Sequence, residues 1–529
     1  MFNWLRRRVP TPPAPPGGVT RNLRGDGWHV RLDLAPQVLS LAIPKETTWR
    51  EDEESLAPTC PVSHDFVSAS MLAVKAKLFD DGLYAAAEIA AQPDKAKLLV
   101  ALVDVAPPIA AAARLGGMDV PLSADARRLT DAFLADELAS KPLAFYSWSD
   151  PLRRIFQQDR LLQWELTPAD AGALIAALDA DPTLSVAYAN YLDVVSRLTN
   201  PFVAGKPDLR RPGGAWFFPP SRSHESELAA RLYGDKPIPD GFSLADEMVR
   251  RLRAGSLRLD PTDTSGWYDL QTWALEPLVL LDKMPEGARL TANSRYREQL
   301  QELFKAILSL TRETHVKQLE IARIGANGGG QPDGEVVVWV VPELTVEPVR
   351  TYYQRRAQGY EFVRQVLESS GRLTTMRRLT PGGPVSRSLD EELADMTALF
   401  RGAAAVAGHE LGMGLATDAE ASGFRRWAQS PDIAEDVRMM VPVFYDLGRR
   451  KTKVWAILGW ATRRLVVSFE TPPAAQVLEG RVTIRLGSIY REIAYPVFAE
   501  AYVSRLLDRD EFRAHCDRYK TRDRILQNL

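Results

Sequence analysis

The chain has 529 residues, of which 45% are hydrophobic and 25% are charged, an ordinary composition for a globular protein. Its 66 lysines and arginines nearly balance its 68 aspartates and glutamates, leaving a formal charge of −2. This balance argues against nucleic acid as a partner, because dedicated nucleic-acid binders carry a basic excess. The only two cysteines, Cys60 and Cys516, exclude a disulfide framework and a Cys-x-x-Cys zinc or redox motif.

The N-terminal residues 1–20 predict a flexible tail, because they are rich in proline and end in Gly17-Gly18. Proline also occupies the positions where a signal peptide would carry its apolar segment. No stretch approaches the ~18 apolar residues of a membrane span. We therefore expect a soluble, cytoplasmic protein without a membrane span. An exported protein is the alternative if the start codon is misassigned.

Residues 21–440 predict a mainly helical body. The body opens with "HVRLDL", whose alternating apolar residues indicate a half-buried strand. Several helix-start signals then follow in chain order: Ser123, Asp150 with Pro151, Thr167 with Pro168, and the capping-box pairs Ser388/Glu391 and Thr417/Glu420. Independent signals of this kind indicate a helix-rich protein, and no internal repeat points to a solenoid.

Two segments, 212–220 and 265–277, combine aromatic residues with polar ones, as in "WFFPP" and "SGWYDLQTW". Aromatic rings beside carboxylates suit carbohydrate binding, and a pair of carboxyls can supply the acid and base of a glycosidase. Asp269 and Glu276 are therefore candidate catalytic residues. The same aromatic residues could instead form a helical core stripe.

The stretch "TRETHVKQLE", residues 311–320, holds a second candidate pair, Glu313 and His315. Its helix has an apolar stripe through Leu300, Phe304 and Ile307 that also includes His315. Helical spacing places Glu313 four residues before Lys317, where the two can form a surface pair. The pattern thus favours a core histidine and leaves an acid/base role as the alternative.

Other motifs give neither a cofactor nor a metal site. "GHELG" places His409 beside Glu410, but the second histidine of a zinc motif is missing because residue 413 is methionine. The glycine-rich "GANGGGQPDGE" follows a helix instead of preceding one, so it is a poor phosphate loop. No nucleophile elbow, Walker motif or dinucleotide fingerprint is present, and we expect no cofactor and no metal.

Residues 441–529 predict a β meander followed by a C-terminal helix packed on the body. Its expected strands are "VPVFYD", "KVWAILGW", "RLVVSF" and "RVTIRL", with a last helix from about Tyr495. The isolated "EVVVWVV" at 335–341 indicates a further buried strand. Basic residues flank the second strand, which suits either contact with nucleic acid or acidic lipid or protection against aggregation; they are Arg449, Arg450, Lys451, Lys453, Arg463 and Arg464.

Three motifs between residues 295 and 470 carry a family resemblance: "LTRETHVKQ", "TVEPVRTYYQRR" and "LFRGAAAVAGHELGMGLATDAEASGF". Together they resemble a large uncharacterised prokaryotic family, a helix-rich domain of unknown function often found in exported proteins. The chain departs from that family where Arg-His-Asp becomes Arg-Glu-Thr and in having no recognisable signal peptide. The resemblance implies a bacterial origin and a helical fold, raises the prospect of export, and implies no activity.

We therefore predict a mainly α protein, a helix-rich body with a small antiparallel β element near the C-terminus. The function that the sequence favours is a soluble binding or interaction protein with an unidentified protein or carbohydrate as its ligand. The alternative is a hydrolase, glycosidase-like or lyase-like, on a helical toroid, with Asp269, Glu276, Glu313 or His315 in its active site.

Overall fold

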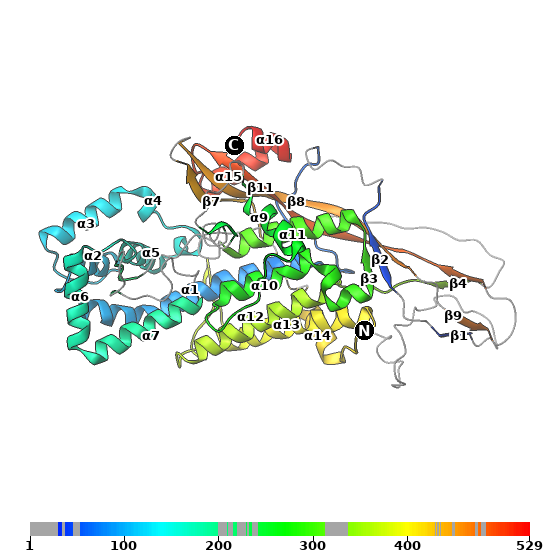
Figure 1. Ribbon diagram of the computed structural model, residues 1–529, viewed down its shortest axis with the longest axis horizontal. Coiled ribbons are helices and arrows are strands. Elements are labelled where there is room, and N and C mark those ends of the chain that lie inside the picture. The colour runs from blue at the N-terminus through cyan, green and yellow to red at the C-terminus, as the bar shows by residue number, and fades with distance from the viewer. Residues whose placement is uncertain are drawn as a thin grey trace.

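The structure is a computed structural model. It describes residues 30–33, 38–45, 53–198, 209, 215–218, 229, 232–234, 242–312, 337–428, 430, 433, 435–446, 450–470, 474–477 and 483–529. Helices predominate, which confirms the mainly α class. The molecule is elongated, with long helices lying side by side along its length and a narrow β arm at one end (Figure 1).

Helix α1 (Ala69–Ala101) is the longest helix of the described chain and runs through its centre. The Ser68 hydroxyl accepts a hydrogen bond from the Met71 amide and so caps its first turn. The first half of α1 is enclosed almost completely, and even Lys75, Lys77 and Asp80 are buried there. Pro93 lies inside the helix, where its ring cannot donate to the carbonyl one turn before it.

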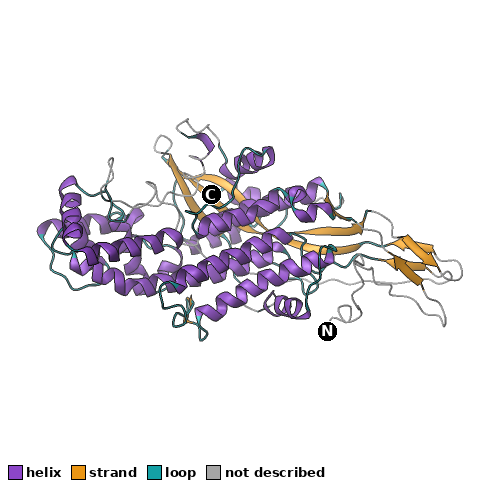
Figure 2. Ribbon diagram, turned by 60° about the horizontal axis from the view of Figure 1, so that its bottom comes forward, coloured by secondary structure: helices purple, strands orange, loops and turns teal. Residues whose placement is uncertain are grey.

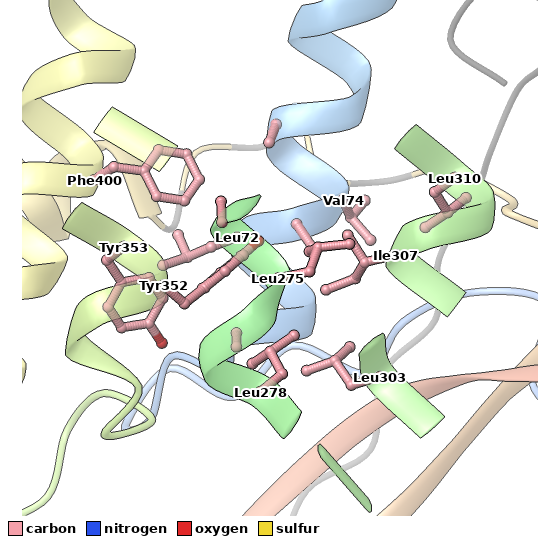
Figure 3. Close-up of a cluster of buried hydrophobic side chains, with 14 of the residues drawn as sticks. Leu72, Val74, Leu275, Leu278, Leu303, Ile307, Leu310, Tyr352, Tyr353 and Phe400 are labelled. Carbon is pink, nitrogen blue, oxygen red and sulfur yellow. The ribbon is translucent and has the colours of Figure 1, made fainter. Parts of the chain in front are cut away.

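The larger lobe is built around the first half of α1. Its other helices, each in contact with at least one neighbour of the set, are α9 (Leu244–Ala254), α10 (Trp267–Val279), α11 (Ser294–Arg312), α12 (Arg350–Glu368), α13 (Leu389–Glu410) and α14 (Asp418–Ala428). Figure 3 shows their shared core, in which Leu72 of α1 faces Leu275 of α10 and Tyr352 of α12. Two short 3-10 turns, Leu281–Lys283 and Pro285–Ala288, follow α10.

The smaller lobe packs on the second half of α1 and has its own buried apolar cluster. Its elements are α2 (Pro107–Leu115), α3 (Ala124–Ala135), α4 (Glu137–Ser140), the 3-10 turn η2 (Ala144–Ser147), α5 (Asp150–Leu162), α6 (Pro168–Ala180) and α7 (Pro182–Leu198). Within the region that we predicted as a single helical body, most of the buried apolar residues thus fall into two clusters joined by α1, while Leu56 and Met440 belong to a third cluster with Val454 and Tyr495 of the sheet.

Most of the predicted helix starts are confirmed. Ser123 and Thr167 cap α3 and α6, and both capping boxes form at α13 and α14. The start of α5 is one residue off, because the Ser149 hydroxyl accepts from the Leu152 amide and Asp150 belongs to the first turn. Local hydrogen bonding therefore determines these helix ends largely without help from the rest of the fold.

A five-stranded sheet lies against the larger lobe (Figure 2). Its long hairpin consists of β8 (Lys451–Phe469) and β11 (Ile489–Val503), which pair antiparallel with Ala461 opposite Tyr495. Strand β7 (Met439–Asp446) pairs antiparallel with β8, and β2 (Leu39–Ala42) pairs with the far end of β8. Strand β3 (Leu290–Ala292) completes the sheet beside β2.

The sheet corrects three details of the prediction. It is mixed, because β2 and β3 pair parallel, and these two strands come from residues far from the C-terminus. The two strands expected at 453–460 and 464–469 are one continuous strand, β8. The helix expected from Tyr495 is instead strand β11, and the last helices are α15 (Arg509–Tyr519) and α16 (Arg522–Gln527).

Three small strand pairs complete the fold. At the tip of the arm, β1 (Val30–Asp33) pairs antiparallel with β9 (Ala474–Val477), and β4 (Val337–Val340) pairs parallel with β10 (Thr483–Leu486). The predicted strands at "HVRLDL" and "EVVVWVV" are thereby confirmed. A short hairpin, β5 (Leu379–Thr380) with β6 (Gly383–Pro384), lies beside α1.

A single glycine allows the N-terminal part of the chain to cross the sheet. The Trp460 amide donates to the Ala57 carbonyl at 2.7 Å, and the Ala57 amide donates to the Trp460 carbonyl at 2.9 Å. Gly459 has φ +148°, and a Cβ there would lie 2.8 Å from the Ala57 oxygen. Only glycine fits such a close backbone crossing.

Candidate functional site

Asp269 lies in the first turn of α10, where it supports the start of the helix. The Gly266 amide donates to its Oδ2 at 3.0 Å. This contact is the carboxylate half of a capping box, and a negative charge in a first turn also complements the helix dipole. The structure thus gives Asp269 a local structural contact, and its catalytic assignment stays a prediction.

Glu276 is buried two turns further along α10 and forms an ion pair. Arg355 Nη1 of α12 donates to Glu276 Oε2 and to the Trp273 carbonyl, both at 2.7 Å. The Arg355 guanidinium also lies 4.2 Å from the centre of the Trp273 ring. A sugar could therefore not stack on that face of Trp273 without displacing Arg355. The catalytic role proposed for Glu276 likewise stays a prediction.

Glu313 and His315 lie outside the described residues, which end in this region at Arg312. The part of their helix that precedes them, α11, buries Leu300, Phe304 and Ile307 as the apolar stripe predicts. The phase of the helix is thereby confirmed up to Leu310, the last residue of the helix whose burial the structure describes.

The aromatic segments expected to bind a ligand contribute instead to the two cores. Phe217 and Phe218 are buried in the smaller lobe, where the Tyr188 hydroxyl donates to the Phe217 carbonyl at 2.6 Å. Trp267 and Tyr268 are buried in the larger lobe against Tyr84 of α1. The alternative interpretation of these aromatic residues, a core stripe, describes their packing better.

Glu410 of "GHELG" is a buried carboxylate that fixes a loop. It accepts hydrogen bonds from the Thr345 amide at 3.0 Å and from the Thr345 hydroxyl at 2.5 Å. Burial raises the pKa of Glu410 to about 7. The neighbouring His409 is half-buried on the last turn of α13, with Nδ1 3.2 Å from the Gly414 carbonyl. These contacts agree with a structural helix end.

Three of the basic residues around β8, which are Lys453, Arg463 and Arg464, contact acidic or aromatic neighbours. Lys453 is buried and pairs with Glu500 at 3.0 Å, and Arg463 pairs with Glu54 at 2.7 Å. The Arg464 guanidinium lies 5.6 Å from the centre of the exposed Tyr490 ring. Lys453 and Arg463 are therefore engaged within the protein, which favours a structural role for them.

A buried polar network between α1, α10 and α12 was missed by the sequence analysis. Asp80 Oδ1 accepts from the Tyr360 hydroxyl at 2.8 Å, and Asp80 Oδ2 accepts from Arg356 Nη2 at 3.1 Å and Gln271 Nε2 at 3.0 Å. Burial raises the pKa of Asp80, and the charge of Arg356 opposes that shift. One residue on, Asp81 pairs with Lys77 at 2.5 Å, and burial raises its pKa to about 8.

A second polar group, which we call the interlobe cluster, lies where the smaller lobe meets α1. It consists of Glu88 and Lys95 of α1, Tyr146 of η2, Asp159 of α5 and Tyr191 of α7. The Lys95 side chain is fully buried, and its Nζ lies 2.7 and 2.8 Å from the two carboxylate oxygens of Asp159. The Tyr146 hydroxyl donates to Glu88 Oε1 at 3.0 Å. The Lys95 ammonium lies 6.0 Å from the centre of the Tyr191 ring.

The interlobe cluster contains two carboxyl groups with raised pKa values, those of Glu88 and Asp159. Burial raises the pKa of Glu88 to about 7; the positive charge of Lys95 opposes this shift and the negative charge of Asp159 adds to it. Burial also raises the pKa of Asp159, although 24% of its side chain remains exposed. Perturbed carboxyls with a specific charged partner are typical of functional sites, although structural ion pairs show the same shifts.

The sequence carried a weak signal for the interlobe cluster. The stretch "FYSWSD", residues 145–150, also places aromatic residues beside polar ones, and it supplies Tyr146. Glu88 and Lys95 are seven residues apart, so they lie on one face of α1. The missing information was the position of Asp159, which lies 64 residues beyond Lys95 and meets it only in the folded protein.

Two classes of feature are absent from the described part of the chain. No helix there is long and apolar enough to cross a membrane. The same residues contain no group of three or more histidine, cysteine, aspartate or glutamate side chains that could hold a metal ion.

Comparison with known proteins gives no relative from which a function could be transferred. No protein-family model matches the chain. No curated protein and no solved structure matches it either.

Proposed function

We propose that the protein is a binding protein that takes a polar ligand at the interlobe cluster. The observation that carries this proposal is the position of the Lys95–Asp159 pair, whose lysine is fully buried and whose aspartate is partly exposed, with Glu88 beside it, where two separate hydrophobic cores meet along one helix. Ligand sites occur preferentially at such junctions, lined by aromatic groups and a few precisely placed polar groups.

The chemistry of the cluster favours a neutral ligand that carries hydroxyl groups. Lys95 supplies the positive charge opposite Asp159, and the pKa of Glu88, raised by burial to about 7, leaves part of that carboxyl protonated at neutral pH, so a second cation would find little uncompensated charge there. Oxygen acceptors predominate, with the carboxylates of Glu88 and Asp159 joined by Gln92 Oε1, a buried atom without a hydrogen-bond partner among the described residues. Rings of Tyr146 and Tyr191 lie beside them. A carbohydrate combines many donors with a face that packs on aromatic rings.

The proposal is tested by a ligand survey followed by a matched pair of variants. Native mass spectrometry of the purified protein, and calorimetric titration with a panel of neutral mono- and oligosaccharides, should identify a ligand. Glu88→Gln should then weaken its binding at least about tenfold, since one charge-assisted hydrogen bond contributes about 1.5–3 kcal/mol. Asp94→Asn, an exposed acid on the same helix, should change the affinity less than about twofold.

Two results would contradict the proposal. If Glu88→Gln and Asp94→Asn bind the ligand equally well, the ligand site lies elsewhere. If the survey finds only a macromolecular partner and no small ligand, the protein is an interaction protein of another kind.

A hydrolase is the second candidate, favoured by one observation. Glu88 titrates near pH 7 beside another carboxyl, so it could donate a proton at neutral pH as the general acid of a glycosidase does. The long helices run side by side along the molecule, so a toroid is not part of this candidate (Figure 1). It predicts saccharide hydrolysis that falls as pH rises through about 7 and that Glu88→Gln reduces at least about 100-fold. Binding without any turnover would exclude it.

A further inference from the structure

The buried network around Asp80 contains polar atoms that the described residues leave unsatisfied. Four such atoms are Gln271 Oε1, Arg356 Nε, the Tyr352 hydroxyl and Trp267 Nε1, and none has a hydrogen-bond partner in the part of the chain that the structure describes. Their side chains are all at least nine-tenths buried, with exposures between 0% and 6%. Gln271 and Arg356 are certainly adjacent, because both donate to Asp80 Oδ2.

A flipped Gln271 side-chain amide would still leave one of its polar atoms without a hydrogen-bond partner among the described residues. If the amide were flipped, Oε1 would face the Asp80 carboxylate and repel it, and Nε2 would become the atom without a partner. The Tyr352 hydroxyl belongs to the same region, since Tyr352 lies one helical turn before Arg356 on α12. Burial raises the pKa of Tyr352 to about 12; the charge of Arg356 opposes this shift and the charge of Asp80 adds to it.

Buried polar atoms in native proteins almost always have a partner, and those that lack one within the protein usually bind ordered water. Two features of this site select the ligand. The charges of Asp80 and Arg356 oppose each other, so the site favours a neutral molecule over an ion. The site needs a molecule that accepts from Arg356 Nε and donates to Gln271 Oε1. The Arg356 guanidinium lies 5.1 Å from the centre of the Tyr360 ring and 5.7 Å from that of the Phe400 ring.

We infer that the core of the larger lobe binds ordered water between α1, α10 and α12, held by Gln271, Arg356 and the Tyr352 hydroxyl. This internal site is separate from the interlobe cluster and does not depend on the function proposed there. It makes the three helices share one hydrated polar network, in which a carboxylate, a guanidinium and an amide are all satisfied together.

The sign of a stability change tests this inference. If the Tyr352 hydroxyl binds water, Tyr352→Phe removes a hydrogen bond and should lower Tm by about 1 °C in a chain of this length. If the hydroxyl has no partner, the same substitution removes a buried unsatisfied group and should leave Tm unchanged or raise it. Tyr360→Phe is the control, because the Tyr360 hydroxyl contacts Asp80 and Arg356 directly and its loss should lower Tm in either case.

A high-resolution crystal structure of the full chain gives the second measurement. The inference requires a water peak within about 3.2 Å of Gln271 Oε1 or Arg356 Nε. A map that resolves other internal waters but has no peak there would overturn it. If the map and the stability change disagree, the map decides, because a substitution can also act through repacking of α12.

Discussion

Single residues in this protein show how burial changes the role of a charge. Glu276 and Arg355, with side chains 10% and 12% exposed, lie between α10 and α12 beside Trp273. Asp150 and Arg153 form an ion pair of similar chemistry on the exposed face of α5, where their side chains are 72% and 48% exposed. Water screens the second pair and only weakly reaches the first, so the same kind of contact should differ in energetic importance.

Removing one partner from each pair tests this difference. Arg355→Ala leaves Glu276 buried without its counter-ion and uncovers the Trp273 ring, so it should destabilise the fold by about 3 kcal/mol. Arg153→Ala should cost less than about 0.5 kcal/mol, because its pair is exposed. Urea unfolding of both variants provides the measurement. Equal losses would mean that the buried pair adds nothing beyond a surface contact.

At the scale of elements, the close approach of α13 and α14 depends on a small residue. Gly402 of α13 faces the backbone of α14, and a Cβ at this position would lie 2.7 Å from the Glu420 carbonyl and 2.8 Å from Phe424 Cβ. Gly423 of α14 has no atom within 4 Å of its would-be Cβ. Two helical glycines on neighbouring helices therefore have opposite packing environments.

Alanine substitution at these two glycines should have opposite effects. Gly402→Ala should destabilise the protein by about 1–3 kcal/mol, because the methyl group forces the two helices apart. Gly423→Ala should be neutral or stabilising by up to about 1 kcal/mol, because alanine favours a helix interior. Thermal unfolding monitored by circular dichroism measures both. A stabilising Gly402→Ala would show that the helix pair separates at little cost.

At the scale of the whole molecule, the buried carboxyls predict how stability depends on pH. Burial raises the pKa of Asp81 to about 8 and those of Glu88 and Glu410 to about 7. All three pKa values exceed the ~4 of a carboxyl in the unfolded chain. Between about pH 4 and pH 8, the folded state therefore binds more protons than the unfolded state. The stability that these groups contribute is complete below about pH 4 and is lost as pH rises through 7 to 8.

The unfolding midpoint in urea should therefore decrease between about pH 5 and pH 8. Glu410→Gln should remove part of this decrease, because glutamine at residue 410 does not titrate. Exposed acids such as Glu391 have the opposite effect on stability, because hydrogen bonds from Ser388 lower the pKa of Glu391. Their effect is confined to pH values below about 5. A midpoint that stays constant or rises from pH 5 to pH 8 would contradict the raised pKa values.

The part of the fold that the sequence predicts is the part determined by local physical chemistry. Caps such as Ser123, Thr167 and the Ser388/Glu391 box depend on residues within one helical turn, and all three form where the pattern places them. The strand containing Val337 and the buried stripe through Leu300 follow from the periodicity of apolar residues in the same way. The helix caps and the helical stripe also indicate the mainly α class.

Other features were decided only by the tertiary structure, because they depend on contacts between residues that are far apart in the sequence. Residues 495–503 have the apolar pattern of either element, and they form a strand because β8 offers them a hydrogen-bonding edge. Asp80 lies 276 residues from Arg356, and Lys95 lies 64 residues from Asp159. Burial and the partner of a carboxylate set its pKa, and neither can be read from neighbouring residues. The sequence by itself thus determined where most helices begin, and the folded chain decided which of its charges are buried together.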